Sequence, residues 1–422
     1  MTGKTALLAA LLAASALSIA AAGAEAQGPA RPLTLARGER GPLAALQTAA
    51  AGQDRAAQDA ALAAARTVAI SADARYALAH YQFEIGRARG DMVMQSQAVD
   101  AMVDSGLAPP AELGSLLANQ ASRAYSAGDV NAADRLLARA VAVQPNDAAL
   151  AADAGQIRAR IAGALARANR GVEAQAAYLA AIGLIQHAIE LQQTSGQPAP
   201  ESWHLRGLAL AYDNRLGPQA IALGRGLVAA YPSPVNWRDA LLAYRELAPA
   251  DPANDAEVAR LMRAGQALAG ERDYADFATA LTAAGFPGEA KAVLDEGVSR
   301  GALTLTKPTT AQLVAAAGRA ATTARAAMPG RDTAARAAAT GAPARAAADA
   351  HLSFGQYAEA VDLYRLALQK GGEDANLVNL RLGAALALAG RTPEARATLA
   401  MVSGPRADLA GFWLAWLQRR PA

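Results

Sequence analysis

Only a few residues of this chain are of types that could do chemistry. Its 422 residues include four histidines and no cysteine. None of the histidines stands in the H-E-x-x-H pattern, which places two zinc ligands and a general base on one helix face. The absence of cysteine excludes thiol catalysis, iron–sulfur ligation and cysteine-based zinc sites. We therefore predict no metal site and expect every histidine to be packed or solvated: His80, His187, His204 and His351.

Motifs for a nucleophile or a phosphate loop are also missing from the sequence. There is no G-x-S-x-G, no S-x-x-K and no complete phosphate loop, since Gly3-Lys4-Thr5 lacks the upstream glycine. The carboxyl pair Asp251 and Asp255 falls at an expected helix start, where acids stabilise the positive end of the helix dipole. We therefore expect no catalytic residue and no cofactor, so that the chain is not an enzyme.

The charge of the chain is balanced and dispersed. Lysine and arginine number 40 against 37 acids, which gives a net charge of +3. A nucleic-acid-binding protein usually gathers its basic residues on one face or stripe. No such run occurs here, so we expect no nucleic-acid partner.

The composition favours helices. More than a quarter of the residues are alanine, which has the highest helix propensity, and only 5% are aromatic. Small side chains allow helices to pack closely, and strand-length runs of β-branched and aromatic residues are nearly absent. The sequence therefore predicts an all-α fold.

A small pattern recurs in tandem near the C-terminus. Gly355 is followed five residues later by Ala360, and 35 residues further on Gly390 is followed by Ala395. The glycine ends one helix and the alanine allows the next helix to pack against it, so each copy predicts a two-helix hairpin. Further alanines continue the period, because Ala220 and Ala290 lie 70 residues apart, as do Ala290 and Ala360.

This pattern resembles the tetratricopeptide repeat, whose unit is about 34 residues long. The resemblance is strong over 114–146 and 341–402 and weaker between them. It implies a right-handed α-α superhelix, or solenoid, of antiparallel helix hairpins, in which the first helix of each hairpin lines a groove for a peptide or protein. The groove positions that it implies are Asn119, Ser122, Tyr125, Arg345, Asp349, Leu380, Arg381 and Ala384.

Composition and the repeat pattern together divide the chain into five segments. Residues 1–26 read as a signal peptide, 27–46 as a linker rich in proline and glycine, and 47–305 as degenerate repeats. Residues 306–340 are rich in alanine and arginine, and we leave open whether they form a helix, a degenerate repeat or a linker. Residues 341–422 read as a pair of repeats with a terminal helix. That helix, over 408–419, either caps the last repeat or binds a membrane surface or a partner.

The first segment predicts export. Lys4 supplies a positive charge, 6–22 is an uncharged apolar stretch, and Ala24-Glu25-Ala26 fits a signal-peptidase site. No cysteine follows that could carry a lipid. We expect a periplasmic or secreted protein with no transmembrane segment after removal of the signal.

These expectations favour a non-catalytic, exported scaffold or adaptor that binds a protein or peptide in the cell envelope. The alternative is a periplasmic helper that handles a polysaccharide in an export or envelope-assembly machine. Such repeat folds serve many unrelated functions, so the repeat alone does not choose between them.

Overall fold

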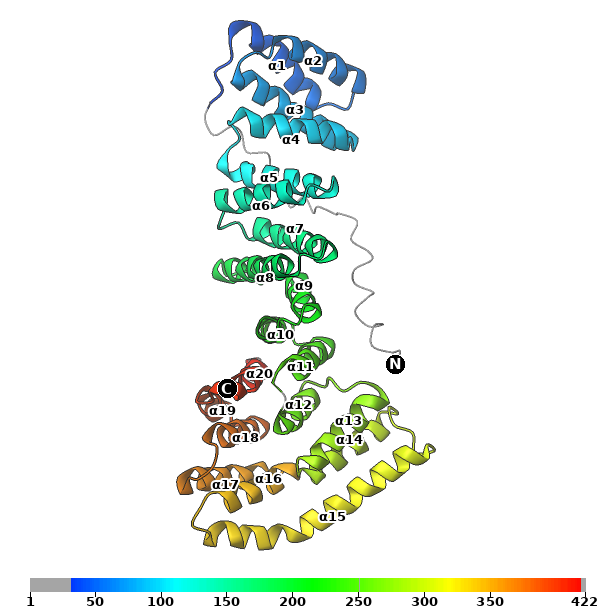
Figure 1. Ribbon diagram of the computed structural model, residues 1–422, viewed down its shortest axis with the longest axis vertical. Helices are drawn as coiled ribbons and strands as arrows, with labels where there is room; N and C mark the ends of the chain where they lie inside the picture. Colours follow the sequence, from blue (N-terminus) through cyan, green and yellow to red (C-terminus); the bar gives the residue numbers. More distant parts are fainter. Residues whose placement is uncertain (1–31, 250, 419–422) are drawn as a thin grey trace. The chain divides into compact units, whose positions relative to one another are not determined.

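The computed structural model describes residues 32–249 and 251–418, and within them the chain is all-α (Figure 1). Twenty α-helices and one short 3-10 helix account for the regular structure of the described residues, which contain no strand. Consecutive helices pack in pairs, which confirms the all-α prediction of helix hairpins. None of the helices in the described part is long and apolar enough to cross a membrane. The expected signal peptide, 1–26, lies outside the described residues.

The chain forms two compact units, residues 1–199 and 200–422, which we call unit 1 and unit 2. The division between degenerate repeats and the following segment that we expected at 305/306 therefore falls inside unit 2. The boundary between the two units lies at Ala199 and Pro200, directly before a helix that begins at Glu201.

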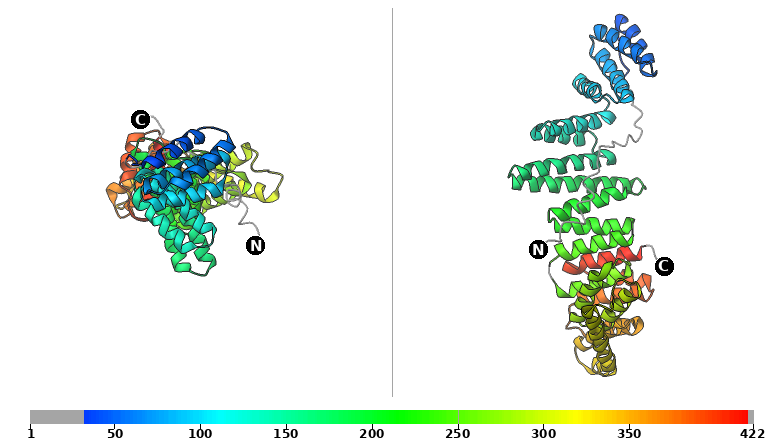
Figure 2. Two further views of the ribbon diagram at one scale, coloured as in Figure 1. Left: turned by 90° about the horizontal axis from the view of Figure 1, so that it is seen from above. Right: turned by 90° about the vertical axis from the view of Figure 1, so that its right-hand side faces the viewer.

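Unit 1 consists of four successive hairpins, whose helices lie as layers in the right-hand view of Figure 2. Apolar side chains on the facing sides of neighbouring helices are buried, and they supply the unit's core. The helices are α1 (Arg37–Ala50), α2 (Arg55–Val68), α3 (Ala72–Arg89), α4 (Met92–Ser105), α5 (Pro110–Ser126), α6 (Val130–Val143), α7 (Ala148–Arg167) and α8 (Gly171–Thr194).

The linker expected over 27–46 is wrong from Arg37 onward, because α1 begins there in spite of Pro42. The buried carboxylate of Glu39 anchors the start of this helix. It accepts hydrogen bonds from the backbone N–H groups of Ala36, Ile70 and Ser71, at 2.8, 3.2 and 2.9 Å, and so joins the start of α1 to the start of α3. Proline in the second turn removes one helical hydrogen bond, and a long-range acceptor of this kind is not visible in the sequence.

Unit 2 holds the remaining helices and one larger core (Figure 1). They are α9 (Glu201–Asp213), α10 (Gly217–Ala230), α11 (Pro234–Leu247), α12 (Pro252–Ala264), α13 (Gly270–Ala283), α14 (Pro287–Ser299), α15 (Pro308–Ala337), α16 (Ala342–Ser353), α17 (Tyr357–Lys370), α18 (Ala375–Leu388), α19 (Thr392–Ala400), η1 (Gly404–Arg406) and α20 (Ala407–Leu417).

The predicted hairpin pattern is present in the backbone. Gly355 and Gly390 have φ angles of 71° and 77°, the left-handed region that glycine adopts without strain. Ala360 and Ala395, five residues later, are completely buried where the second helix of each hairpin packs. The 35-residue repeat is therefore a repeat of structure.

Three turns of the described residues use the same left-handed conformation without glycine, at Asn169, Arg215 and Gln266, and the first two also keep the alanine of the pattern. Asn169 and Arg215 have φ angles of 59° and 55°, and each is followed five residues later by a buried alanine, Ala174 or Ala220. The α7–α8 hairpin thus follows the common pattern with two unusually long helices, of 20 and 24 residues.

Residues 306–340 form neither a hairpin nor a linker over most of their length. Pro308–Ala337 is one helix of 30 residues, α15, which packs against α13, α14 and α16. Its ends are fixed by neighbouring helices. Glu271 contacts Lys307 and Thr310 at the start, and the Lys370 ammonium donates to the carbonyls of Ala335, Arg336 and Ala338 at the end. A cation that satisfies the last carbonyls of a helix is a common way to end it.

The terminal helix α20 supports the capping alternative. Phe412 and Trp413 are fully buried, and the helix packs against α10 and α12 as well as α18 and α19. The Trp416 ring N–H donates to the carbonyl of Ala264 at 3.0 Å, across 152 positions. The last helix therefore covers the last hairpin and joins it to the beginning of unit 2.

Candidate partner-binding groove

Five of the predicted groove residues lie in unit 2, and four of these are buried. Leu380 and Ala384 have no exposed surface, and Arg381 and Asp349 are only 4% and 9% exposed. A residue that lines an open groove must be reachable, so the predicted role of these four residues is wrong.

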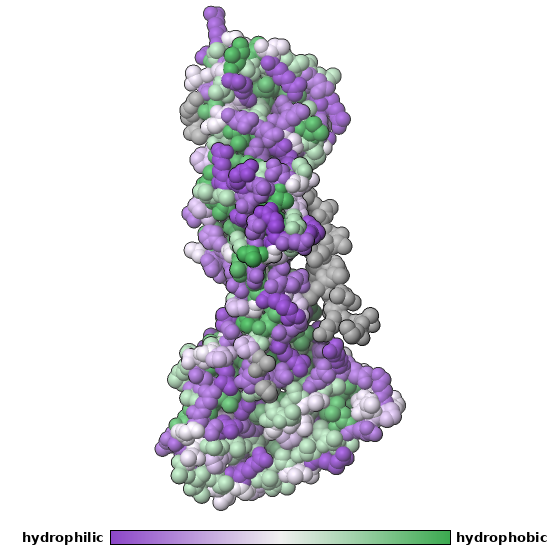
Figure 3. All heavy atoms as spheres, viewed as in Figure 1, coloured by the Kyte–Doolittle hydropathy of each residue, from purple (hydrophilic) through white to green (hydrophobic). Residues whose placement is uncertain are grey.

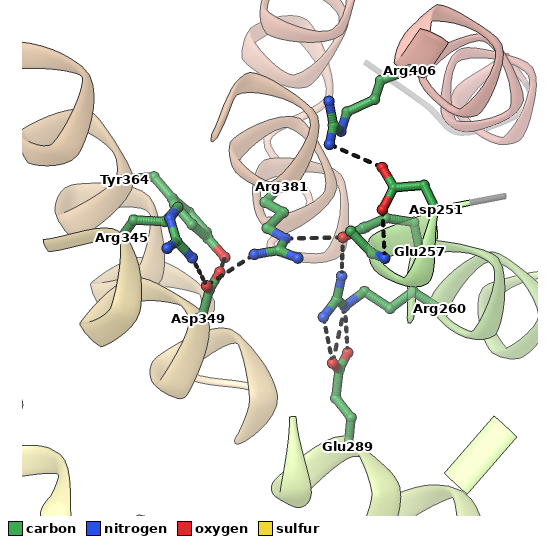
Figure 4. A network of polar contacts seen from close by, with 10 residues as sticks. Asp251, Glu257, Arg260, Glu289, Arg345, Asp349, Tyr364, Arg381 and Arg406 are labelled. Atoms are coloured by element: carbon green, nitrogen blue, oxygen red, sulfur yellow. Dashed lines mark hydrogen bonds and ion pairs between the residues drawn. The ribbon is translucent and has the colours of Figure 1, made fainter. Parts of the chain in front are cut away.

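Arg381 and Asp349 instead belong to a buried network of charges (Figure 4). Asp349 accepts hydrogen bonds at 2.9 Å from both Arg345 and Arg381, and at 2.6 Å from the Tyr364 hydroxyl. The Arg381 Nε also donates to Glu257 at 3.1 Å, which connects α18 to α12. Arg345 is partly exposed and pairs in addition with Glu373 on the loop before α18.

The network continues into α14. Arg260 donates to Glu257 at 2.6 Å and forms a two-pronged pair with Glu289. The guanidinium carbons of Arg260 and Arg381 lie 4.1 and 4.9 Å from the centre of the Phe286 ring. Such pairs are attractive because the ring face is negative.

The pKa values show how burial and charge compete in this network. Burial would raise the pKa of Glu257, but the guanidiniums of Arg260 and Arg381 outweigh it and the pKa is lowered. Burial would lower the pKa of Arg260, but Glu257 and Glu289 raise it well above its usual value. Burial and the charge of Asp349 raise the pKa of Tyr364, so that its hydroxyl stays a donor. The network fixes the hairpins in place.

The other three predicted groove residues belong to unit 1. Asn119, Ser122 and Tyr125 are half-buried on α5. The side-chain amide oxygen of Asn119 accepts a hydrogen bond from Arg123, which also pairs with Asp100 on α4. The eight predicted residues therefore belong to two different units, three to unit 1 and five to unit 2.

An open groove of about 800 Å³ lies elsewhere in unit 2, between α14, the middle of α15 and the turn from α16 to α17. Such a volume is typical of ligand sites. The groove is lined by Arg263, Gly288, Glu289, Lys291, Ala292, Asp295, Ala321, Thr322, Arg325, Ala326, Leu352, Ser353, Phe354, Gly355 and Tyr357.

The floor of the groove is rigid because α14 and α16 meet there closely. The Ser353 hydroxyl accepts hydrogen bonds from the N–H groups of Gly288 and Glu289, at 2.9 and 3.2 Å, and so caps the start of α14 from another helix. A β-carbon on Gly288 would lie 2.4 Å from the Ser353 carbonyl oxygen, so only glycine fits. The groove is thus built on fixed elements.

A smaller hollow of about 190 Å³ lies beside it and shares Ser353 and Phe354. The two hollows meet α15 on either side of the line of residues that it buries, which includes Ala317, Ala321 and Met328. The part of the surface that α15 occupies is mostly pale green in Figure 3, interrupted by separate purple patches, as an alanine-rich helix with isolated arginines would be.

Sequence reasoning missed this groove. Its one available signal was the scarcity of large side chains over 306–340, which lets α15 lie across its neighbours without filling the space beside them. Among the described residues, no group of three or more histidine or acidic side chains is arranged to hold a metal ion.

Comparisons with known proteins give little further. No protein-family model matches the chain, and no curated protein matches its sequence. A solved structure described as "Structure of Naa15/Naa10 bound to HypK-THB" contains a chain that matches at a TM-score of 0.35 and 12% identity. The match covers 79% of this chain and spans 63% of the length of the other.

Proposed function

We propose that the chain is a non-catalytic, exported scaffold of the tetratricopeptide type, which binds a partner protein through the groove beside α15. The observation that carries this proposal is the groove itself, an open hollow of about 800 Å³ whose walls come from several fixed helices. Stacked helix hairpins present rigid, extended surfaces of this kind, which suit recognition.

The rigidity of the surroundings supports a binding role. The buried network around Arg381 joins α12, α14, α16, α17 and α18, and Lys370 and Glu271 hold the two ends of α15. A surface that is already ordered loses little conformational entropy when a partner binds. The groove is therefore preorganised for binding.

Site-specific photo-cross-linking tests this proposal. A photoreactive residue at Thr322 lies in the groove, whereas the same residue at Thr323 lines neither hollow, and both positions are exposed. In cells that naturally produce the protein, we expect illumination to attach a defined protein at Thr322 and none at Thr323. The attached protein is identified by mass spectrometry.

Two results would count against the proposal. If position 322 gives no protein adduct, or if the two positions give the same adducts, the groove is not where a partner protein binds. Export is proposed from the sequence, and the mass measurement described in the Discussion tests it separately.

A further inference from the structure

We propose that the groove beside α15 takes an acidic peptide segment, and that the segment's carboxylates pair with Arg325. This inference rests on the proposed function and names the chemistry of the partner. The site is on α15, which is not part of a repeated hairpin, and none of the residues that the repeat resemblance selected contributes to it.

Among the charged residues that line the groove, one cation has no acidic partner in the described part of the chain. Glu289 is paired with Arg260, and Asp295 with Lys291 at 2.5 Å. Arg263 is paired with Glu296 at 3.0 Å. Each acid in the lining therefore already has a basic partner within the fold.

Arg325 differs from the other charged residues in the lining. Its guanidinium carbon lies 4.4 Å from the centre of the Phe354 ring, and no acid among the described residues forms an ion pair with it. Stacking on the ring leaves the edge of the guanidinium, with its N–H donors, free to bind a carboxylate in the two-pronged manner that arginine favours. A stacked arginine is also already oriented, so that less entropy is lost on binding.

The smaller hollow also contains an arginine that is not paired with an acid. Arg331 lines it, and no acid in the described part of the chain is paired with that arginine. The only acid on α15 is Asp332, which pairs with His351 at 2.9 Å. Arg331 follows Arg325 by six residues, about 9 Å along a helix axis. Because the two hollows lie on either side of the buried line of α15, each arginine offers a carboxylate a separate contact.

A peptide fits these observations better than a glycan does. Sugars commonly bind to the open face of an aromatic ring, but the Arg325 guanidinium already lies over one face of the Phe354 ring. Beside this cation, the lining offers the partly buried Tyr357 and small side chains such as Ala321 and Ala326. Those groups suit an extended chain that carries acids.

A binding titration with the full-length mature protein tests the inference. The probe is fluorescein-labelled hexaglutamate, measured by anisotropy at 0.15 M salt, where charges more than about 8 Å apart are screened. We expect hexaglutamate to bind and hexaglutamine not to bind. Arg325→Gln should weaken binding at least about fivefold, since it removes a charge-assisted hydrogen bond.

The matched control is Arg319→Gln. Arg319 is an exposed arginine on the same helix that lines neither hollow, so the change removes the same charge from the same element. We expect less than a twofold effect on hexaglutamate binding. Both substitutions are at exposed positions, and unchanged melting curves would confirm that neither affects the fold.

Three outcomes would overturn the inference. If Arg319→Gln weakens binding as much as Arg325→Gln, the peptide is attracted by the total positive charge of α15 and not by Arg325. If neither peptide binds, the groove does not select acids. If an oligogalacturonate binds and hexaglutamate does not, the ligand is an acidic glycan. If neither peptide binds but a protein still cross-links at Thr322, the scaffold function is supported and only the preference for acidic segments is overturned.

Discussion

Arg381 Nε donates to Glu257 Oε1 at 3.1 Å, although 124 positions separate the two residues. The contact joins α18 to α12 and lies where both side chains are at most 5% exposed. Together with α20, which packs against α10 and α12, it connects the last repeat to the first helices of unit 2. Unit 2 is thereby closed on itself by its own terminal helices.

Removal of Arg381 should destabilise unit 2 strongly. Arg381→Met would leave Glu257 and Asp349 short of a buried positive charge, and breaking a buried ion pair by removing one partner costs about 3–5 kcal/mol. All four tryptophans of the chain lie in unit 2, so their fluorescence in a urea titration reports this unit alone.

The control for this prediction is Arg365→Met. Arg365 pairs with Glu394 between α17 and α19, but both side chains are about half exposed, at 46% and 45%. Exposed pairs contribute about 0–1 kcal/mol. Equal losses for the two variants would show that the buried network does not hold the unit together.

Acid should weaken unit 2 through Glu257. The pKa of Glu257 in the folded state is lowered below its ordinary value of 4.5, so its ion pairs stabilise the fold above that pH, and this stability is lost as the pH falls through the folded-state pKa. We expect the urea midpoint to decrease below pH 4.5. Glu257→Gln should start lower and depend less on pH in this range. If Glu257→Gln lost stability in acid as steeply as the parent does, Glu257 would not be the source of the acid sensitivity.

The hairpins could be predicted because their signals are local. Gly355 and Ala360 mark a turn and a close helix crossing within six residues, and the structure has both. The α7–α8 hairpin was harder to recognise, because Asn169 takes the turn conformation that glycine takes elsewhere. A left-handed asparagine does not stand out in a sequence.

The candidate site could not be predicted for a different reason. The sequence places Arg381 on the inner helix of a repeat, which is correct, but its burial depends on α12, which is more than a hundred residues away. Likewise, α15, which forms one side of the groove, is held at its two ends by Glu271 and Lys370 from distant helices. Contacts at such separations have no periodic signature in the sequence.

Glycine to alanine changes should have opposite effects at two positions of unit 2. Gly355 has a φ angle of 71°, and a β-carbon there would meet only the Tyr357 side chain at 3.9 Å, an ordinary contact, so Gly355→Ala tests mainly backbone strain and should cost about 1–2 kcal/mol. Gly330 lies within α15 with nothing near its missing β-carbon, so Gly330→Ala should stabilise by about 0.5–1 kcal/mol. Thermal melts followed by tryptophan fluorescence would measure both; a shift in the same direction for the two variants would contradict this account.

Export should leave a chain that begins at Gln27. The Ala24-Glu25-Ala26 stretch after an apolar segment fits signal-peptidase cleavage between Ala26 and Gln27. Intact-mass analysis of the protein recovered from the envelope fraction would give the mass of residues 27–422. Recovery of the full-length mass from that fraction would show that this site is not used.

Larger side chains at the helix crossings should destabilise the repeats. Ala360 is completely buried on α17 where the helix meets its neighbours, and three further methylene-sized groups would have to displace them. Overpacking of this kind costs about 1–3 kcal/mol, so Ala360→Leu should lower the urea midpoint of unit 2. Ala358→Leu makes the same chemical change two positions earlier, on the exposed side of the same helix, and should change the stability by less than about 0.5 kcal/mol. If Ala360→Leu changes the urea midpoint as little as Ala358→Leu, the helix crossing can accommodate a leucine. Close packing at the repeated alanine would then not stabilise the hairpin.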